Sequence, residues 1–130
     1  DDGLVVPVIR SAETLSLREL SQAAAALAEK ARAGKLLPDE MSGSSFTVSN
    51  MGMLDVESFS AIINPGESGI LAVASTIPTP VVRDGKIVVR SLMKITVSVD
   101  HRIIDGTVAA RFIHAIKAKL EDIELWKSLT

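Results

Sequence analysis

The sequence contains no cysteine and no tyrosine, and only one tryptophan and three phenylalanines occur among its 130 residues. Without cysteine, the chain has no disulfide, no thiolate metal ligand and no cysteine nucleophile. So few aromatic side chains argue against binding to single-stranded nucleic acids, because the bases stack on such side chains. The core must therefore be built from aliphatic side chains, and any chemistry must come from other polar groups.

An excess of charge and long apolar runs are also lacking. Fourteen basic and sixteen acidic residues give a net charge of -2, and no stretch is strongly basic, which argues against binding to a nucleic-acid backbone. No apolar run approaches the length of a transmembrane helix, and no secretory signal peptide is visible. A composition of 47% hydrophobic and 23% charged residues predicts one globular domain.

The clearest predicted element is a helix over residues 16–34. Ser16 and Glu19 form the S-x-x-E pattern of a capping box, and Gly34 suits the position just after a helix end. Apolar residues three and four positions apart predict one buried face, made of Leu17, Leu20, Ala24, Leu27 and Ala31.

Several short strands are predicted around this helix. The apolar run at residues 3–9, the alternating segment 44–50 and the apolar segment 68–76 each have the length of a strand. Asp84-Gly85 lies between runs of β-branched residues, which predicts a hairpin. The order of strand, helix, four or five strands and helix predicts an α+β domain, a mixed sheet covered by helices.

The last predicted strand leads into the stretch VSVDHRIIDG, residues 97–106. Its apolar residues alternate up to Val99, so His101 lies on the apolar, buried face if the extended conformation continues. Asp105 precedes Gly106 at the start of a final helix and is a good N-cap candidate. Residues on one face of that helix are apolar: Val108, Phe112, Ile116, Leu120 and Ile123.

His101 and Asp105 form an H-x-x-x-D pattern. A histidine titrates near neutral pH, so it can take up and return a proton, and a nearby carboxylate can orient its ring. The pattern is also common by chance. In the alternative interpretation Asp105 only caps the helix and His101 only packs at a strand end, and for Asp105 both roles can hold together.

The stretch DHRIIDG resembles the D-H-R-x-x-D-G signature of the dihydrolipoyl acyltransferases, the acyltransferase components of 2-oxo acid dehydrogenase complexes. Essentially the whole chain resembles this family, and one small departure is "NPGES", where members often carry two prolines in a row. The resemblance implies a coenzyme A-dependent acyltransferase fold like that of the chloramphenicol acetyltransferases. The other similar stretches, in order, are GLVVPVIR, AEKARAGKLLPDEM, GSSFTVSNMGM, SFSAIINPGESGILAVAS and GTVAARFIHAIKAKLED.

The resemblance implies that acyl groups pass between the thiols of dihydrolipoamide and coenzyme A, both acting as substrates, with no metal. His101 corresponds to the signature histidine, the general base for the attacking thiol. Ser49 corresponds to the serine that stabilises the negative oxygen of the tetrahedral intermediate, although from the residues alone Ser45 and Thr47 are equally eligible. Asp105 corresponds to the aspartate that holds the histidine turn. In this family the serine and the histidine come from neighbouring chains.

The family's catalytic domain is longer than this chain, so residues 1–130 are expected to form its C-terminal part. The earlier strands, and an arginine thought to pair with the signature aspartate, are expected to be absent, as are the lipoyl and subunit-binding domains. The chain begins with Asp1 and not with Met, so we expect that an N-terminal segment has been removed.

The family also implies partners and a location. We expect a homotrimer that assembles into a larger cage, with the decarboxylase and dihydrolipoamide dehydrogenase components bound through the absent domains. Neither a nucleic acid nor a membrane is an expected partner. The expected location is the bacterial cytoplasm or the mitochondrial matrix, and not the secreted fraction.

The segment NMGMLDVESFSAIINP is closer to the pyruvate branch of the family, which predicts transfer of an acetyl group. Branched-chain and succinyl groups are alternatives. A second class is a non-catalytic scaffold or binding component of the same fold, which would be free to lose His101, Asp105 and Ser49, whereas all three are present. A third is an acetyltransferase for a hydroxyl acceptor, like the chloramphenicol acetyltransferases.

Overall fold

The fold is that of a computed structural model, which describes residues 3–129. The chain divides into two compact units. The first consists of residues 1–44 with 126–130, and the second of residues 45–125. The second unit carries the sheet and all of the predicted site residues.

The first unit contains α1 (Leu17–Arg32) between two short 3-10 helices, η1 (Ala12–Thr14) and η2 (Pro38–Met41). The capping box at the start of α1 is confirmed, because the hydroxyl of Ser16 accepts from the backbone N–H of Glu19 while the Glu19 side chain accepts from the backbone of Ser16. Gly34 has a φ of 65°, and the N–H of Lys35 donates to the carbonyl of Lys30 at 2.9 Å. These features end the helix as a Schellman motif.

The predicted strand over residues 3–9 is wrong, because this segment is irregular. The backbone N–H of Val8 donates to the carbonyl of Glu40 at 2.8 Å, and the guanidinium of Arg10 donates to the carbonyls of Asp39 and Ser42. The segment is thus held to η2 and to the residue after it, and not to a sheet. An apolar run cannot distinguish these two cases, because a strand also needs a partner strand beside it.

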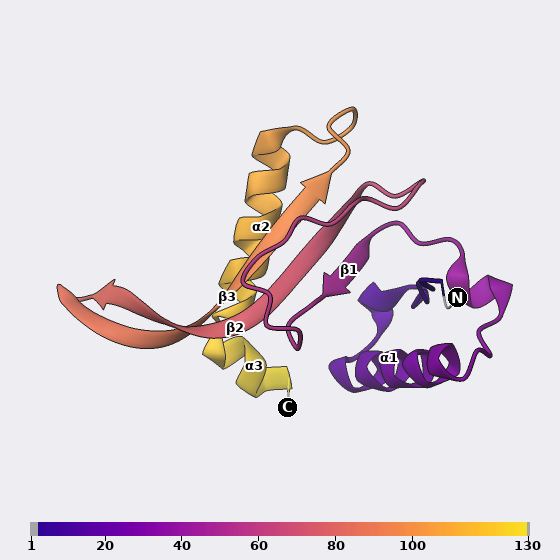
Figure 1. Cartoon of the computed structure of the whole chain (residues 1–130), viewed down its shortest axis with the longest axis horizontal. Coiled ribbons are helices and arrows are strands. Elements are labelled where there is room, and N and C mark those ends of the chain that lie inside the picture. Colours follow the sequence, from indigo (N-terminus) through magenta and orange to yellow (C-terminus); the bar gives the residue numbers. More distant parts are fainter. Residues whose placement is uncertain (1–2, 130) are drawn as a thin grey trace. The chain divides into compact units, whose positions relative to one another are not determined.

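The second unit contains a sheet of β1 (Thr47–Asn50), β2 (Gly69–Arg83) and β3 (Lys86–Val99), in that order. β1 is parallel to β2, and β2 is antiparallel to β3. The predicted hairpin is confirmed, since Asp84 and Gly85 have φ values of 51° and 72° and form the two-residue turn between β2 and β3. Such positive φ values are those of a type I′ turn. Figure 1 shows the hairpin running out beyond the end of α2.

The predicted number of strands is wrong, because two long strands replace four short ones. The segment 77–80, which contains Pro78 and Pro80, lies within β2. β1 pairs with β2 only over residues 70–73, so the rest of that edge of β2 has no partner strand among residues 3–129. Prolines are tolerated at such an edge, where no hydrogen bond of the ladder is lost.

The core of the second unit lies in the first part of β2, where the middle strand is flanked on both sides. Ile70, Leu71, Ala72 and Ala74 are buried there. α2 (Gly106–Leu120) runs beside β3 (Figure 1), and its Phe112 meets Phe46 edge to face with the ring centres 5.5 Å apart. Packing is therefore concentrated at the end of the sheet where β3 terminates.

The predicted final helix is two helices. α2 ends at Leu120 and α3 (Ile123–Leu129) follows. The carboxylate of Asp122 accepts from the backbone N–H of Leu125 at 3.0 Å, as an N-cap does. The continuous apolar stripe through Ile123 concealed this break.

Candidate functional site

His101 lies in a tight turn directly after β3. β3 ends at Val99, and the backbone N–H groups of Ile103 and Ile104 donate to the carbonyl of Asp100 at 3.0 and 2.9 Å. His101 is exposed, so the prediction that it lies on the buried apolar face is wrong. Because the carbonyl of Asp100 accepts both of these hydrogen bonds, the chain turns at Asp100, one residue earlier than the alternation suggested. The alternation of faces therefore stops at Asp100.

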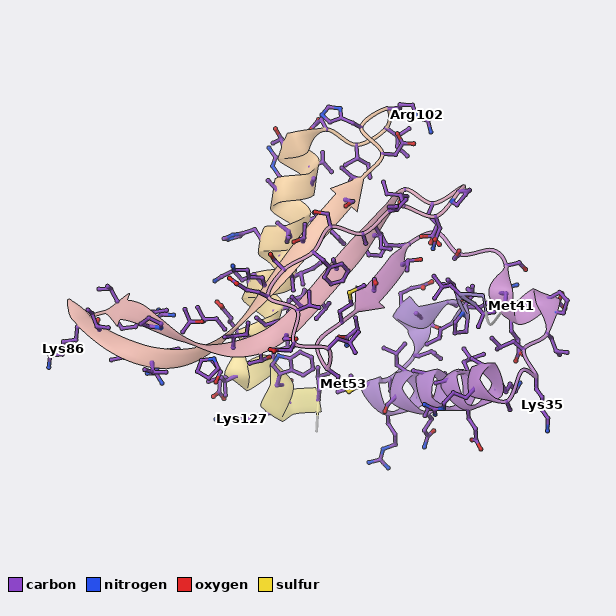
Figure 2. All side chains as sticks on the ribbon, viewed as in Figure 1. Lys35, Met41, Met53, Lys86, Arg102 and Lys127 are labelled. Atoms are coloured by element: carbon purple, nitrogen blue, oxygen red, sulfur yellow. The ribbon has the colours of Figure 1, made fainter. Side chains whose placement is uncertain are left out.

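The side chain of Asp100 also stabilises this turn through hydrogen bonds to Arg102. Its carboxylate accepts from the guanidinium of Arg102 at 2.6 Å and from the backbone N–H of the same residue at 3.0 Å. These two interactions lower the pKa of Asp100 to about 2. The side chain of Arg102 is 88% exposed and that of Asp100 only 20%, and Figure 2 shows Arg102 at the turn beyond the end of β3.

Asp105 is the N-cap of α2, as predicted. Its carboxylate accepts from the backbone N–H groups of Thr107 and Val108 at 2.7 and 2.9 Å. Within residues 3–129 its side chain makes no hydrogen bond to His101. Asp105 therefore fixes where the turn enters the helix and does not itself orient the imidazole in this chain.

Ser49 lies in β1, half-buried, and opposes Ala72 of β2. Strand alternation places it on the same face as Thr47 and opposite the exposed Val48. This arrangement agrees with the predicted alternation of residues 44–50. The structure thus places the hydroxyl of Ser49 at the strand that flanks the buried part of β2.

A pocket of about 390 Å³ opens beside His101. It is lined by residues 63–67 and by residues 99–102, and we call it the His101 pocket. Neither Ser49 nor Asp105 lines it. Within one chain the structure therefore brings His101 together with the loop before β2, and not with the serine.

The loop before β2 contributes a polar cluster that was not predicted. Glu67 is only 6% exposed, and its carboxylate accepts from the hydroxyl of Thr47 and from the side-chain amide of Asn64. The sequence holds one clue, a glutamate immediately before an apolar strand. Because Thr47 and Glu67 are 20 positions apart, periodicity cannot reveal their contact.

The end of β3 is joined to the start of β2 at close range. The backbone N–H of Asp100 donates to the carbonyl of Ser68 at 3.0 Å. A Cβ atom on Gly69 would lie 2.9 Å from the carbonyl oxygen of Ser98, so only glycine fits at this crossing without a shift. The close pairing of Gly69 with Val99, together with the bond from Asp100 to Ser68, sets the position at which the His101 turn begins.

Among residues 3–129, no group of three His, Cys, Asp or Glu side chains is placed to hold a metal ion. No helix of this part of the chain has the length and apolar character needed to cross a membrane. His101, its pocket and the strand of Ser49 make up the candidate site.

Residues 1–127 match the family of 2-oxoacid dehydrogenases acyltransferase (catalytic domain). The chain belongs to this family. Its mixed sheet with helices is that of acyltransferase catalytic cores, which agrees with the predicted fold class.

Three relatives of the chain are named for different complexes. The acetyltransferase component of the acetoin cleaving system of Bacillus subtilis is 44% identical, over 94% of this chain and 31% of that protein. The mitochondrial acetyltransferase component of the pyruvate dehydrogenase complex of Schizosaccharomyces pombe is 46% identical, with coverages of 92% and 26%. The succinyltransferase component of the 2-oxoglutarate dehydrogenase complex of Rickettsia typhi is also 46% identical, with coverages of 95% and 31%.

Two solved structures share the fold. One is Azotobacter vinelandii dihydrolipoamide acetyltransferase, studied for the role of a serine, a histidine and an asparagine in its catalytic mechanism; it is 45% identical, with a TM-score of 0.87 over 94% of this chain and 50% of that one. The other is the cubic core of the pyruvate dehydrogenase multienzyme complex, 44% identical with the same TM-score and coverages. The chain thus spans about a third of the curated relatives or less, and about half of these solved chains.

Proposed function

We propose that the chain is part of an enzyme that transfers an acetyl group between dihydrolipoamide and coenzyme A, in the core of a pyruvate dehydrogenase-type complex. His101 acts as the general base, Ser49 stabilises the oxyanion and Asp105 holds the histidine turn. Family membership and the exposed histidine beside a pocket both support this proposal.

One observation carries the assignment of the residues. The serine and histidine studied in the Azotobacter vinelandii enzyme are 52 positions apart, and its asparagine follows the histidine by four. Ser49 and His101 are also 52 positions apart, and Asp105 follows His101 by four. The one difference is aspartate for asparagine. Both are good N-cap residues, which fits the capping role of Asp105 here.

The proposed reaction uses these groups in one sequence of steps. The imidazole of His101 takes the proton of the attacking thiol, and the thiolate attacks the carbonyl carbon of the thioester. The hydroxyl of Ser49 donates to the oxygen that becomes negative in the tetrahedral intermediate. The carbon–sulfur bond to the first thiol then breaks, and the imidazolium returns its proton to the departing sulfur.

The two catalytic residues are proposed to come from neighbouring copies of the chain. Within one chain Ser49 does not line the His101 pocket, which supports a site completed by a second copy. A trimer that builds a larger core meets this requirement, and one matching structure is a cubic core. A site at such an interface also explains why His101 is exposed within one chain.

Further proposals concern the whole protein. Residues 1–130 would form the C-terminal part of the acyltransferase domain, since they match about half of the solved cores. Lipoyl and subunit-binding domains would lie outside this chain and would bind the decarboxylase and dihydrolipoamide dehydrogenase. The relatives come from bacteria and from a mitochondrial complex, so we propose the bacterial cytoplasm or the mitochondrial matrix as the location.

The test is acetyl transfer from acetyl-coenzyme A to dihydrolipoamide by the whole protein, followed as acetyl-dihydrolipoamide by chromatography. His101→Ala is expected to abolish transfer, because it removes the imidazole that takes the thiol proton in the proposed reaction. The matched control is His114→Ala, which removes the chain's other histidine from an exposed position on α2. Full activity of His101→Ala would refute the general-base role.

The same assay distinguishes the acyl groups. A relative named as a succinyltransferase is as similar to the chain as one named for pyruvate dehydrogenase, so succinyl-coenzyme A is the comparison substrate. We expect acetyl transfer to be faster. Faster succinyl transfer would indicate that the protein belongs to a 2-oxoglutarate dehydrogenase-type complex instead. If neither group were transferred, the scaffold alternative would be favoured.

A further inference from the structure

The buried Glu67 holds two separate segments together. Its carboxylate oxygens lie 2.8 and 2.7 Å from the hydroxyl of Thr47 in β1, and one of them lies 3.3 Å from the amide nitrogen of Asn64. The same amide nitrogen donates to the Thr47 hydroxyl at 2.9 Å. A threonine hydroxyl has one proton, so Thr47 shares that proton between the two carboxylate oxygens while it accepts from Asn64.

Burying the carboxylate of Glu67 costs free energy unless hydrogen-bond donors surround it. A carboxylate that is removed from water must recover the lost hydrogen bonds from the protein. Here the donors come from β1 and from the loop at residues 62–68, 20 and 3 positions away from Glu67. Moving either segment breaks these bonds, so the cluster holds β1 and the loop in one relative position.

The strand of Ser49 and the turn of His101, which serve two neighbouring sites in the proposed assembly, are both attached to this cluster. Thr47 lies two residues before Ser49 on the same face of β1. On the other side, Asn64 and Glu67 line the His101 pocket. The next residue, Ser68, accepts the backbone N–H of Asp100, directly before His101.

We propose that Glu67 is a positioning residue for acyl transfer, acting through Thr47 on the strand of Ser49 and through the adjoining loop on the turn of His101. This inference rests on the proposed function and deepens it. Glu67 neither takes the proton nor touches the oxyanion in this assignment. Its carboxylate keeps the two elements that do so in their reactive places.

The kinetic test uses Glu67→Ala and Glu67→Gln in the whole protein, in the acetyl-transfer assay. Because a displacement of about 1 Å can cost on the order of 10²-fold in rate, we expect Glu67→Ala to lower kcat by at least about tenfold. KM for both substrates is expected to change less than about twofold, since the misplaced groups act mainly on the transition state. Glu67→Gln keeps one acceptor oxygen and the side-chain volume, so it is expected to restore most of the rate.

The matched control is Glu121→Ala, which removes a carboxylate from an exposed pair with Lys117. We expect it to leave kcat and KM unchanged. Wild-type kinetics for a folded Glu67→Ala would overturn the proposal. So would a loss as large in Glu67→Gln as in Glu67→Ala, because a glutamine retains the positioning contact.

A second readout does not depend on activity. The Cε1–H resonance of His101 reports the surroundings of the turn, and that of His114 on α2 serves as an internal reference. We expect both Glu67 variants to shift the His101 resonance, Glu67→Ala more than Glu67→Gln, and to leave His114 in place. An unmoved His101 resonance would refute the link between Glu67 and the turn, even if activity fell.

The two measurements separate the inference from the function on which it rests. If the wild-type protein transfers no acyl group, the proposed function fails, and the His101 resonance alone decides whether Glu67 orders the turn. A double-mutant cycle with Thr47→Val tests the route through β1. We expect the combined variant to lose little more rate than either single one, and fully multiplicative losses would contradict that route.

Discussion

The backbone N–H of Asp100 donates to the carbonyl of Ser68 at 3.0 Å, which joins the residue before His101 to the residue before β2. The register continues from this bond, with Gly69 opposite Val99. The position of the histidine turn therefore depends on how closely the start of β2 approaches the end of β3, and on the loop that precedes β2.

Gly69→Ala is expected to destabilise the protein. The added Cβ would meet the carbonyl oxygen of Ser98 at 2.9 Å and the ring of Phe46 at 3.2 Å, and crowding of this kind costs about 1–3 kcal/mol of folding free energy. Urea denaturation measures the change. Gly106→Ala is the control, since nothing lies within 4 Å of its added Cβ, and an equal loss in both variants would contradict the steric explanation.

Asp105→Ala is expected to cost about 1 kcal/mol of stability, because two backbone N–H groups at the start of α2 lose their acceptor. Asp105→Asn should restore nearly all of it, since asparagine caps equally well. Thermal unfolding of the three proteins tests this prediction. A loss in Asp105→Asn as large as in Asp105→Ala would show that the charge, and not the cap, is what matters.

Ser49→Ala is expected to lower kcat for acetyl transfer by about 10²–10³, the usual effect of removing one oxyanion donor, with little change in KM. Ser45→Ala is the control, because Ser45 precedes β1 and supplies only its backbone carbonyl to the hydrogen bonds of this region. An unchanged rate in Ser49→Ala would remove the oxyanion role from this serine.

Arg102→Gln is expected to raise the pKa of Asp100 from about 2 toward its usual value of 3.8, because the guanidinium bond is the largest cause of the lowering. A carboxyl pKa that is lower in the folded state stabilises the protein above about pH 4 and ceases to do so as the pH falls toward 2. The stability difference between wild type and variant should therefore shrink over this range.

Carbon-13 NMR titration of the Asp100 carboxyl group measures the pKa directly. Lys94→Gln is the control, since Lys94 pairs with Glu57 and not with Asp100. If the pKa of Asp100 stayed near 2 in Arg102→Gln, the backbone N–H of residue 102, and not the guanidinium, would be its main cause.

Elements specified by neighbouring residues were predicted correctly. The capping box of Ser16 and Glu19, the Asp84-Gly85 turn and the N-cap at Asp105 each involve groups within a few residues of one another. The type of residue at each position limits the backbone there, whatever the rest of the chain does. Such features can be read from spacing alone.

Predictions that depended on distant partners were wrong where the partner was not evident. The segment 3–9 has the composition of a strand, but Val8 binds the carbonyl of Glu40. The misplacement of His101 has a local cause instead, because the chain turns at Asp100, whose carbonyl accepts from the N–H groups of Ile103 and Ile104. The segment 68–76 and the first half of the predicted hairpin were expected as separate strands, but both belong to β2.

By itself, the sequence determined the family, the capped helices, the hairpin turn and the spacing of Ser49, His101 and Asp105, because each is a matter of residue type and separation along the chain. The tertiary structure alone decided that His101 shares a pocket with the loop before β2. It also decided that Glu67 meets Thr47 across 20 positions. Contacts of this kind form when β1, β2 and β3 lie side by side. The Asp84-Gly85 turn indicates the pairing of β2 with β3, but no local pattern encodes the pairing of β1 with β2.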